Sequence, residues 1–226
     1  MKLHEIVKIV MVVAVLAALW GCKKDNNPVA NNTPSYIIPL AVGNQWDYVD
    51  SLFNSTGGFL RVDSSSLRIV GKTTVQYQSQ SQDVYYWNWL NNLTKQPSAS
   101  SWLTANESDG NYGIGGISSK GTFVLARTLW AKYPSNVGDS WQRANISLNG
   151  DSTFSISDTS TVTVLAVNEV FPTRTGNLTC YVYNYQREGT VSTSVYYSID
   201  IGYVGVIVRS NGYVTFKKTL RSFKLN

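Results

Sequence analysis

The chain has 226 residues, of which 43% are hydrophobic, 12% aromatic and 15% charged, so it can build a sizeable core and extensive disorder is not expected. The formal net charge is +5, and four basic residues near the C-terminus (Lys217, Lys218, Arg221 and Lys224) are expected to form a solvated strand end. The alternative is a basic surface that contacts anionic lipid or polysaccharide. The single histidine, His4, lies in an N-terminal leader, which excludes histidine-dependent nucleophilic catalysis and imidazole metal sites from the rest of the chain.

The first 21 residues have the pattern of a secretory signal peptide. A short basic segment precedes an unbroken apolar run at residues 9–20, which is too short for a membrane-spanning helix of about 20 residues. The run ends in the sequence LWGC, residues 19–22, which resembles the lipobox of bacterial lipoproteins. Residues 1–21 are therefore expected to be a cleaved signal peptide.

The lipobox resemblance implies that Cys22 becomes the mature N-terminus and carries a diacylglycerol on its sulfur. Two or three acyl chains anchor a protein firmly, because each buried methylene contributes about 0.8 kcal/mol. The next residues are rich in Asn, Pro and charge, so 22–34 is expected to comprise the lipidated cysteine and a flexible tether. We expect attachment to the outer membrane of a Gram-negative bacterium, on its periplasmic face or at the cell surface, and no nucleic-acid partner.

Residues 35–226 are predicted to form a single all-β domain. Apolar and polar residues alternate almost throughout, and no segment keeps a 3.6-residue period over about twelve residues. The expected strands are 46–53, 59–70, 73–80, 83–90, 111–117, 121–130, 140–148, 153–157, 160–170, 178–188, 193–200, 202–210 and 212–223. Residues 98–106 could form one or two helical turns. Long antiparallel strands in sequence order predict a meander that forms a curved sheet, half-barrel or sandwich.

One eight-residue phrase occurs twice, as PLAVGNQW at 39–46 and as PSNVGDSW at 134–141. Proline marks a strand boundary, and Gly followed by Asn or Asp suits a turn with positive φ. Each phrase is therefore expected to be a turn that starts a strand with a buried tryptophan. The alternative is a ligand site at the two tryptophans. The repeat also leaves open a weak internal duplication, at about 35–130 and 131–226, although the halves do not otherwise align by eye.

The two phrases and the segment YYSIDIGYVGVIVRS, residues 196–210, resemble a large set of uncharacterised bacterial envelope proteins. Some of those proteins are compared with the lipoprotein carriers LolA and LolB, whose curved sheets hold acyl chains. The resemblance implies a β-rich envelope lipoprotein. This sequence lacks the helices that cover the sheet in those carriers, so the resemblance does not imply carrier activity.

Two rows of aromatic residues are the candidate ligand-binding residues. The rows are Tyr85, Trp87 and Trp89 in the strand 83–90, and Tyr181, Tyr183 and Tyr185 in the strand 178–188. In each row, alternate residues point to the same side of a strand. The first row could be ordinary core, or it could form an exposed platform for sugar rings or line a groove for an acyl chain. Because tyrosine hydroxyls tolerate a wet boundary, the tyrosine row is the better candidate for the surface.

No catalytic residue, metal site or cofactor is expected. With Cys22 lipidated, Cys180 is the one remaining thiol, and its place in an alternating strand favours a buried small hydrophobe over a nucleophile. The acidic segment 107–111 is expected to be a turn, since it lacks the later carboxylate of a calcium loop. Three functions stay open. We favour an accessory or scaffold protein that acts through protein contacts, over a glycan- or lipid-binding module and over a hydrolase with paired carboxylates.

Overall fold

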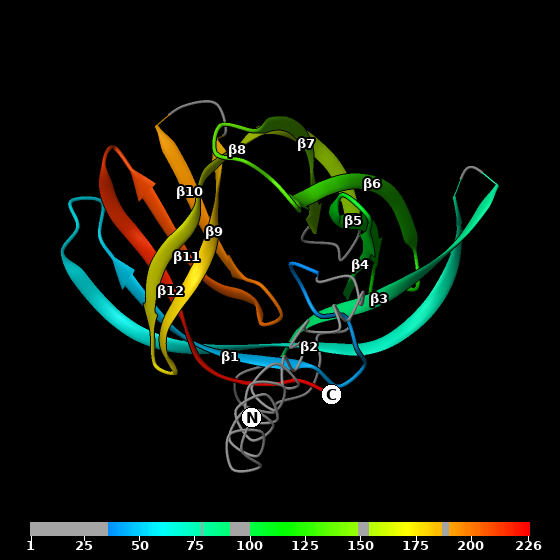
Figure 1. The fold of residues 1–226 in the computed structure, drawn as a ribbon, viewed down its shortest axis with the longest axis horizontal. Helices are drawn as coiled ribbons and strands as arrows, with labels where there is room; N and C mark the ends of the chain where they lie inside the picture. The colour runs from blue at the N-terminus through cyan, green and yellow to red at the C-terminus, as the bar shows by residue number, and fades with distance from the viewer. Residues whose placement is uncertain (1–35, 78, 91–99, 149–153, 187–189) are drawn as a thin grey trace, which may run out of the picture. The chain divides into compact units, whose positions relative to one another are not determined.

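In the part of the chain that the structure describes, twelve antiparallel strands, joined in chain order, make up one continuous sheet (Figure 1). The computed structural model describes residues 36–77, 79–90, 100–148, 154–186 and 190–226. The strands are β1 (Gln45–Phe53), β2 (Phe59–Tyr77), β3 (Gln80–Leu90), β4 (Ser101–Glu107), β5 (Gly110–Ile117), β6 (Phe123–Lys132), β7 (Ser140–Leu148), β8 (Phe154–Thr173), β9 (Gly176–Gln186), β10 (Val191–Ser198), β11 (Gly202–Ser210) and β12 (Tyr213–Lys224). The all-β fold predicted from the alternation is confirmed.

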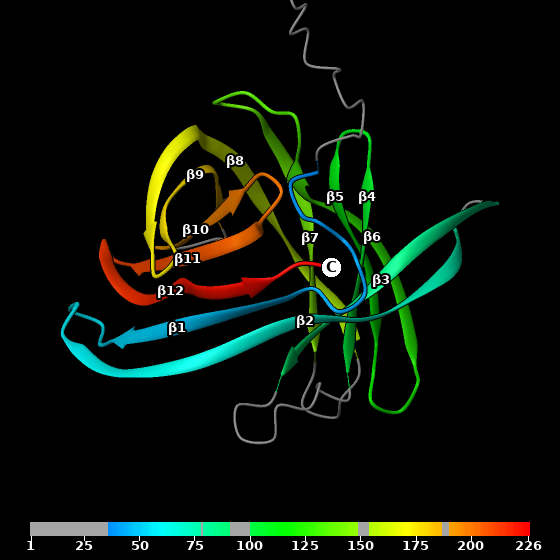
Figure 2. The ribbon, with the colours of Figure 1, turned by 60° about the horizontal axis from the view of Figure 1, so that its bottom comes forward.

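The first and last strands pair in the middle of the sheet, so its two edges are β6 and β7. The sheet curls until these edges lie close together, as Figures 1 and 2 show. No backbone ladder joins β6 to β7 in the described ranges. Side chains connect them instead: Trp141 Nε1 donates to the Leu129 carbonyl at 2.9 Å, and the Ala144 amide donates to Thr128 Oγ1 at 3.0 Å. We call this β6–β7 junction the seam.

A long hairpin adds a second layer to part of the sheet. Strands β8 and β9 extend past their neighbours, and the hairpin crosses β11 and β12 (Figure 1). Phe171 on β8 stacks on Tyr196 with ring centroids 4.1 Å apart, and the Arg174 amide donates to the Leu220 carbonyl at 3.0 Å. This hairpin encloses part of the main core, so the fold combines a curled sheet with a local sandwich.

The two repeated phrases form the same turn. Gly43 and Gly138 have φ values of 96° and 89°, in the region that favours glycine. The Gly43 amide donates to the Ile69 carbonyl at 2.8 Å, and the Gly138 amide donates to the Val164 carbonyl at 2.9 Å. The two donors are 95 positions apart in the sequence (43 and 138), and so are the two acceptors (69 and 164). The prediction that each phrase is a strand-starting turn is confirmed.

The same correspondence continues into the strands that follow. Trp46 faces Leu67 across β1 and β2, and Trp141 faces Val162 across β7 and β8, again 95 positions apart. Trp46 is fully buried and Trp141 is half-buried. The β1–β2 and β7–β8 hairpins therefore begin in the same register. The division of the chain at about residue 130 stays a prediction.

Three expected elements differ from the structure. Residues 98–106 do not form helical turns where they are described, because Ser101–Glu107 is strand β4, paired between β3 and β5. Sheet neighbours decided this conformation over the weak local pattern. The expected strands 59–70 and 73–80 are joined in β2 as far as Tyr77, and the described parts of 153–157 and 160–170 belong to β8, which begins at Phe154. A register shift lies near each point of division, between Ile69 and Gly71 in β2 and between Ile156 and Thr159 in β8, and it interrupts the alternation there.

The expected signal peptide and tether, including Cys22, lie outside the described residues. Within the described ranges, no helix is long and apolar enough to cross a membrane.

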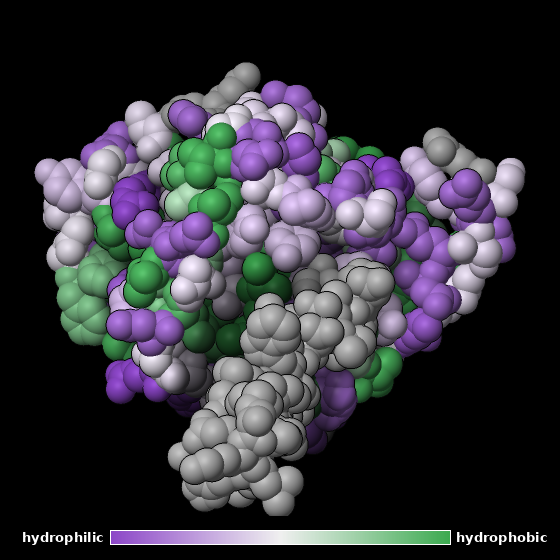
Figure 3. Space-filling view, in the orientation of Figure 1, coloured by the Kyte–Doolittle hydropathy of each residue, from purple (hydrophilic) through white to green (hydrophobic). Residues whose placement is uncertain are grey.

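Apolar side chains reach the surface at the β1–β2 hairpin, which lies at the left of Figure 3. Phe59 is 62% exposed, and Leu60 and Val62 beside it are exposed as well. Phe53 meets Phe59 edge to face, with ring centroids 5.9 Å apart. This patch is separate from the cavity described next, whose lining includes no residue of β1 or β2.

Candidate functional site

The inner side of the curled sheet holds a cavity of about 430 Å³. Its lining comes from β3, β4 and β6 to β11, so strands from both halves of the chain contribute. Eleven of the fifteen lining residues are aromatic or aliphatic. Sites for small organic molecules are typically apolar and measure about 300–1,000 Å³, so this cavity has the size and character of a ligand site.

Four tryptophans form much of the apolar wall. They are Trp87 and Trp89 on β3, Trp102 on β4 and Trp130 on β6. Trp87 is held from two directions, since it stacks on Trp46 at 5.9 Å and meets Trp130 edge to face at 6.1 Å. This packing fixes the orientation of an indole that lines the cavity, which pre-forms the wall.

Strands β9, β10 and β11 supply most of the rest of the apolar wall, to which Ile146 on β7 also contributes. Tyr185, Tyr197 and Tyr203 line it, and burial raises the pKa of each, so their hydroxyls stay neutral. Tyr203 and Val206 face the cavity despite their odd spacing, because the β10–β11 register shifts between them. Tyr185 Oη also donates to the Trp130 carbonyl at 2.8 Å, which ties β9 to the edge strand β6.

The polar part of the lining is concentrated on β7 and β8. Ser160 Oγ donates to Asn145 Oδ1 at 3.2 Å, and Asn145 Nδ2 donates to Asp158 Oδ1 at 2.9 Å. Among the described residues that line the cavity, Arg143 is the one with a charge. Its guanidinium carbon lies 4.7 Å from the centroid of the Tyr185 ring, and its positive charge partly offsets the effect of burial on the pKa of that tyrosine. Arg143 Nε is buried and has no hydrogen-bond partner.

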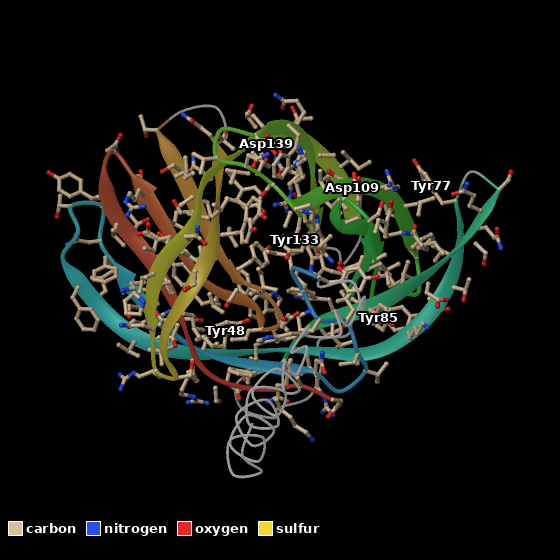
Figure 4. All side chains as sticks on the ribbon, viewed as in Figure 1. Tyr48, Tyr77, Tyr85, Asp109, Tyr133 and Asp139 are labelled. Carbon is tan, nitrogen blue, oxygen red and sulfur yellow. The ribbon has the colours of Figure 1, made fainter. Side chains whose placement is uncertain are left out.

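The seam borders this cavity. Trp130 on one edge strand and Arg143 on the other both line it. Tyr133 and Asp139, labelled in Figure 4, mark the connection between these edge strands. Asp139 forms a 2.8 Å ion pair with Lys132 Nζ, which links the two ends of the β6–β7 connection. Side chains and not a backbone ladder therefore join the two edges where the seam borders the cavity.

The structure brings half of the predicted aromatic residues into one site. Trp87, Trp89 and Tyr185 come from the two predicted rows and line the same cavity. Tyr183 is fully buried beside it, and its hydroxyl donates to the Lys132 carbonyl at 2.6 Å. The prediction that the tyrosine row faces the surface is wrong for Tyr183 and Tyr185, because the curl of the sheet turns that side inward.

The two remaining residues of the rows do not line the cavity. Tyr85, labelled in Figure 4, is half-buried with Lys72 Nζ 5.6 Å from its ring centroid. Tyr181 is half-buried against Tyr133, with ring centroids 5.4 Å apart. Neither row forms a flat exposed platform. The tryptophans that close the repeated phrases do not line the cavity either, so the alternative of a ligand site at Trp46 and Trp141 has no support from its geometry.

Other side chains that could react or bind a metal have structural roles instead. Cys180 is fully buried, and burial raises the pKa of its thiol to about 12, with a smaller contribution from Glu169. Asp109, in the predicted turn between β4 and β5, accepts a hydrogen bond from Tyr112 Oη at 2.9 Å. The described residues that line the cavity include no Asp or Glu. In the part of the chain that the structure describes, no group of three or more His, Cys, Asp or Glu residues is placed to hold a metal ion.

Sequence reasoning missed several lining residues. They include Trp102, Trp130, Arg143, Tyr197 and Tyr203. One signal could have identified Arg143. The two repeated phrases continue as Trp-Asp-Tyr48 and Trp-Gln-Arg143, so a charged residue occupies the position that an aromatic residue holds in the first copy.

Comparisons with known proteins give limited information. No family model matches the chain. No curated protein matches it either. A solved structure from Bacteroides fragilis, described as an exported protein with a YmcC-like fold, aligns with a TM-score of 0.45 and 12% identity over 85% of this chain and 100% of its own. A protein from Parabacteroides distasonis, described as a lipoprotein, aligns with a TM-score of 0.46 and 12% identity over 84% of this chain and 99% of its own. At this level of similarity, neither structure indicates what this chain does.

Proposed function

We propose that the protein is a non-enzymatic, lipid-anchored envelope protein that holds a small apolar or amphiphilic molecule inside its curled sheet. The observation that carries the proposal is the 430 Å³ cavity with eleven aromatic or aliphatic residues among the fifteen that line it. Removing such surface from water is favourable, so an apolar guest of matching size would bind there. The anchoring at Cys22, and with it the outer-membrane location, rests on the LWGC sequence.

The geometry favours a lipid-like guest over a glycan. A sugar-binding platform would present tryptophans on a flat open surface with polar groups around them. Here Trp87 is buried, Trp89 is half-buried, and both line a concave cavity on the inner side of the curled sheet. An accessory role through protein contacts alone, which the sequence favours, would give this cavity no occupant. The two functions therefore differ in a measurable way.

A bulky side chain placed inside the cavity should block binding. Thr193 lines the cavity from β10, whereas Ser192, the preceding residue, does not. In Thr193→Trp the new indole would occupy the space of the guest, so the affinity for the neutral fluorophore N-phenyl-1-naphthylamine should fall at least about tenfold. Ser192→Trp is the matched control and should bind as the wild type does.

The assay uses the mature chain from position 22, with Cys22→Ser, exported behind a signal peptide that is cleaved without lipidation and purified without detergent. We call this the unlipidated mature chain. Fluorescence titration gives the affinity, and thermal unfolding shows whether each variant is folded. A wild-type chain that does not bind the fluorophore, or a Thr193→Trp variant that binds it unchanged, would contradict the proposal.

The anchor is tested separately in growing cells. Cys22→Ser in the full chain removes the sulfur that would carry the diacylglycerol, so incorporation of a labelled palmitate analogue should be lost and the protein should leave the membrane fraction. Cys180→Ser is the control, because that thiol is buried and should not be acylated. Acyl labelling that persists in Cys22→Ser would refute the lipoprotein assignment.

A further inference from the structure

Arg143 gives the cavity one feature that an apolar guest alone does not explain. We propose that the natural ligand is an amphiphile with a single anionic group, a carboxylate or a phosphate, and that Arg143 binds that group. This inference rests on the proposed function, since it specifies the ligand of the same cavity. With this role for Arg143, the cavity would prefer anionic lipids and fatty acids to neutral apolar molecules.

The first argument is the unmet bonding capacity of Arg143. Its Nε is buried without a hydrogen-bond partner, and no Asp or Glu pairs with its guanidinium among the described residues. Arg143 as a whole is half-buried, but its Nε is shielded from water and gains no hydrogen bond in exchange, which costs free energy. The rings of Tyr185 and Trp130, 4.7 and 5.7 Å from the guanidinium carbon, recover part of that cost. A guest with an oxyanion would supply the missing acceptor.

The second argument compares the two hairpins. In the first, Tyr48 faces Ser65, and in the second, Arg143 faces Ser160 at the equivalent register position. Tyr48 is fully buried, and its hydroxyl donates to the Tyr203 carbonyl at 2.9 Å. A neutral aromatic residue therefore satisfies this position of the hairpin completely. The matched register alone does not call for a guanidinium, which leaves the charge of Arg143 available for a ligand.

The third argument is the distribution of polarity along the lining. Asn145 and Ser160 lie on the same pair of strands as Arg143, so three of the four polar lining residues belong to β7 and β8. The remaining wall consists of the four tryptophans of β3, β4 and β6, the tyrosines and valines of β9 to β11, Ile146 on β7 and Thr193 on β10. An amphiphile would place its headgroup against β7 and β8, and its apolar body against the tryptophans. Arginine suits this role because its planar fork matches carboxylate and phosphate oxygens.

The test compares three probes with the same apolar chain. Dodecanoate, dodecyl phosphate and dodecan-1-ol each compete with N-phenyl-1-naphthylamine for the unlipidated mature chain at about pH 8, where the carboxylate is ionised. We expect at least one anionic probe to bind about tenfold or more tighter than the alcohol, as a charge-assisted hydrogen bond would provide. The carboxylate and phosphate arms show which headgroup fits better.

Variants assign this preference to Arg143. Arg143→Met keeps the apolar length of the side chain and should bind all three probes with nearly equal affinity, whereas Arg143→Lys should restore part of the preference. The wild-type comparison decides the inference even where a variant fails to fold. An alcohol that binds as tightly as both anions would overturn the anionic ligand and leave the apolar cavity function standing. If none of the probes binds, the proposed function fails as well.

Discussion

Trp46→Ala is expected to lower the free energy of unfolding by about 3–5 kcal/mol, which is a large part of the stability of a domain of this size. The Trp46 indole is fully buried and stacks on Trp87, and its Nε1 donates to the Ile201 carbonyl at 2.6 Å. Alanine would remove this packing, open a cavity and leave that carbonyl without its donor. Denaturant-induced unfolding of the unlipidated mature chain measures the loss.

The second repeated phrase offers a matched control for this substitution. Trp141 starts β7 as Trp46 starts β1, and its Nε1 makes a similar bond to the Leu129 carbonyl at 2.9 Å. Trp141 is only half-buried, so Trp141→Ala should cost clearly less. Equal losses for the two alanine variants would contradict the importance assigned to burial at Trp46.

The buried ion pair between β1 and β12 gives the second large effect. Lys218 Nζ lies 2.7 and 3.0 Å from the two carboxylate oxygens of Asp50 and also bonds to Ser65 Oγ. The two residues are only 6% and 8% exposed. Asp50→Asn would leave a buried cation without its counter-charge, which typically costs about 3–5 kcal/mol. The double variant Asp50→Asn with Lys218→Met removes the stranded charge and should regain much of the stability.

The loss of folding stability in Asp50→Asn should depend on pH. Burial lowers the pKa of Lys218, and its bonds to Asp50 raise it in part. In Asp50→Asn the raising contribution is gone, so the folded chain releases the lysine proton at a lower pH than the unfolded chain does. Folding stability then rises with pH, because the unfolded state binds more protons. The deficit relative to wild type should shrink from about pH 7 to about pH 9.5. A deficit that grows over this range would contradict the mechanism.

Lys218 also shows where charge patterning misleads. The sequence places it in a basic C-terminal segment that is expected to be solvated. Its strand alternates, however, and β12 pairs with β1 in the centre of the sheet, which buries alternate residues. Asp50 is 168 positions away in the sequence, so local patterning cannot identify the partner. Long-range strand pairing has to be known first.

Local patterns were reliable where a short stretch determines its own conformation. The Gly-Asn and Gly-Asp turns, the tryptophans that follow them and the shared orientation of Trp87 with Trp89 were all predictable from a few residues. The direction in which a strand face points was not predictable, since it depends on how the whole sheet curls. That is why Tyr185 was assigned to the surface and lies in the cavity. Trp102 was not predicted for a related reason. It lies on β4, whose strand conformation comes from its pairing with β3 and β5 and not from its local sequence pattern.

The central claim is that the curled sheet holds an apolar or amphiphilic guest. Native mass spectrometry of the unlipidated mature chain tests it most directly. The account predicts a reproducible added mass on the wild type and on Ser192→Trp, and its loss in Thr193→Trp. Fragmentation of the bound species should then identify a lipid-like molecule. A clean unliganded mass for the wild type, in repeated detergent-free preparations and with the probes added, would contradict the account and favour a protein that acts through protein contacts alone.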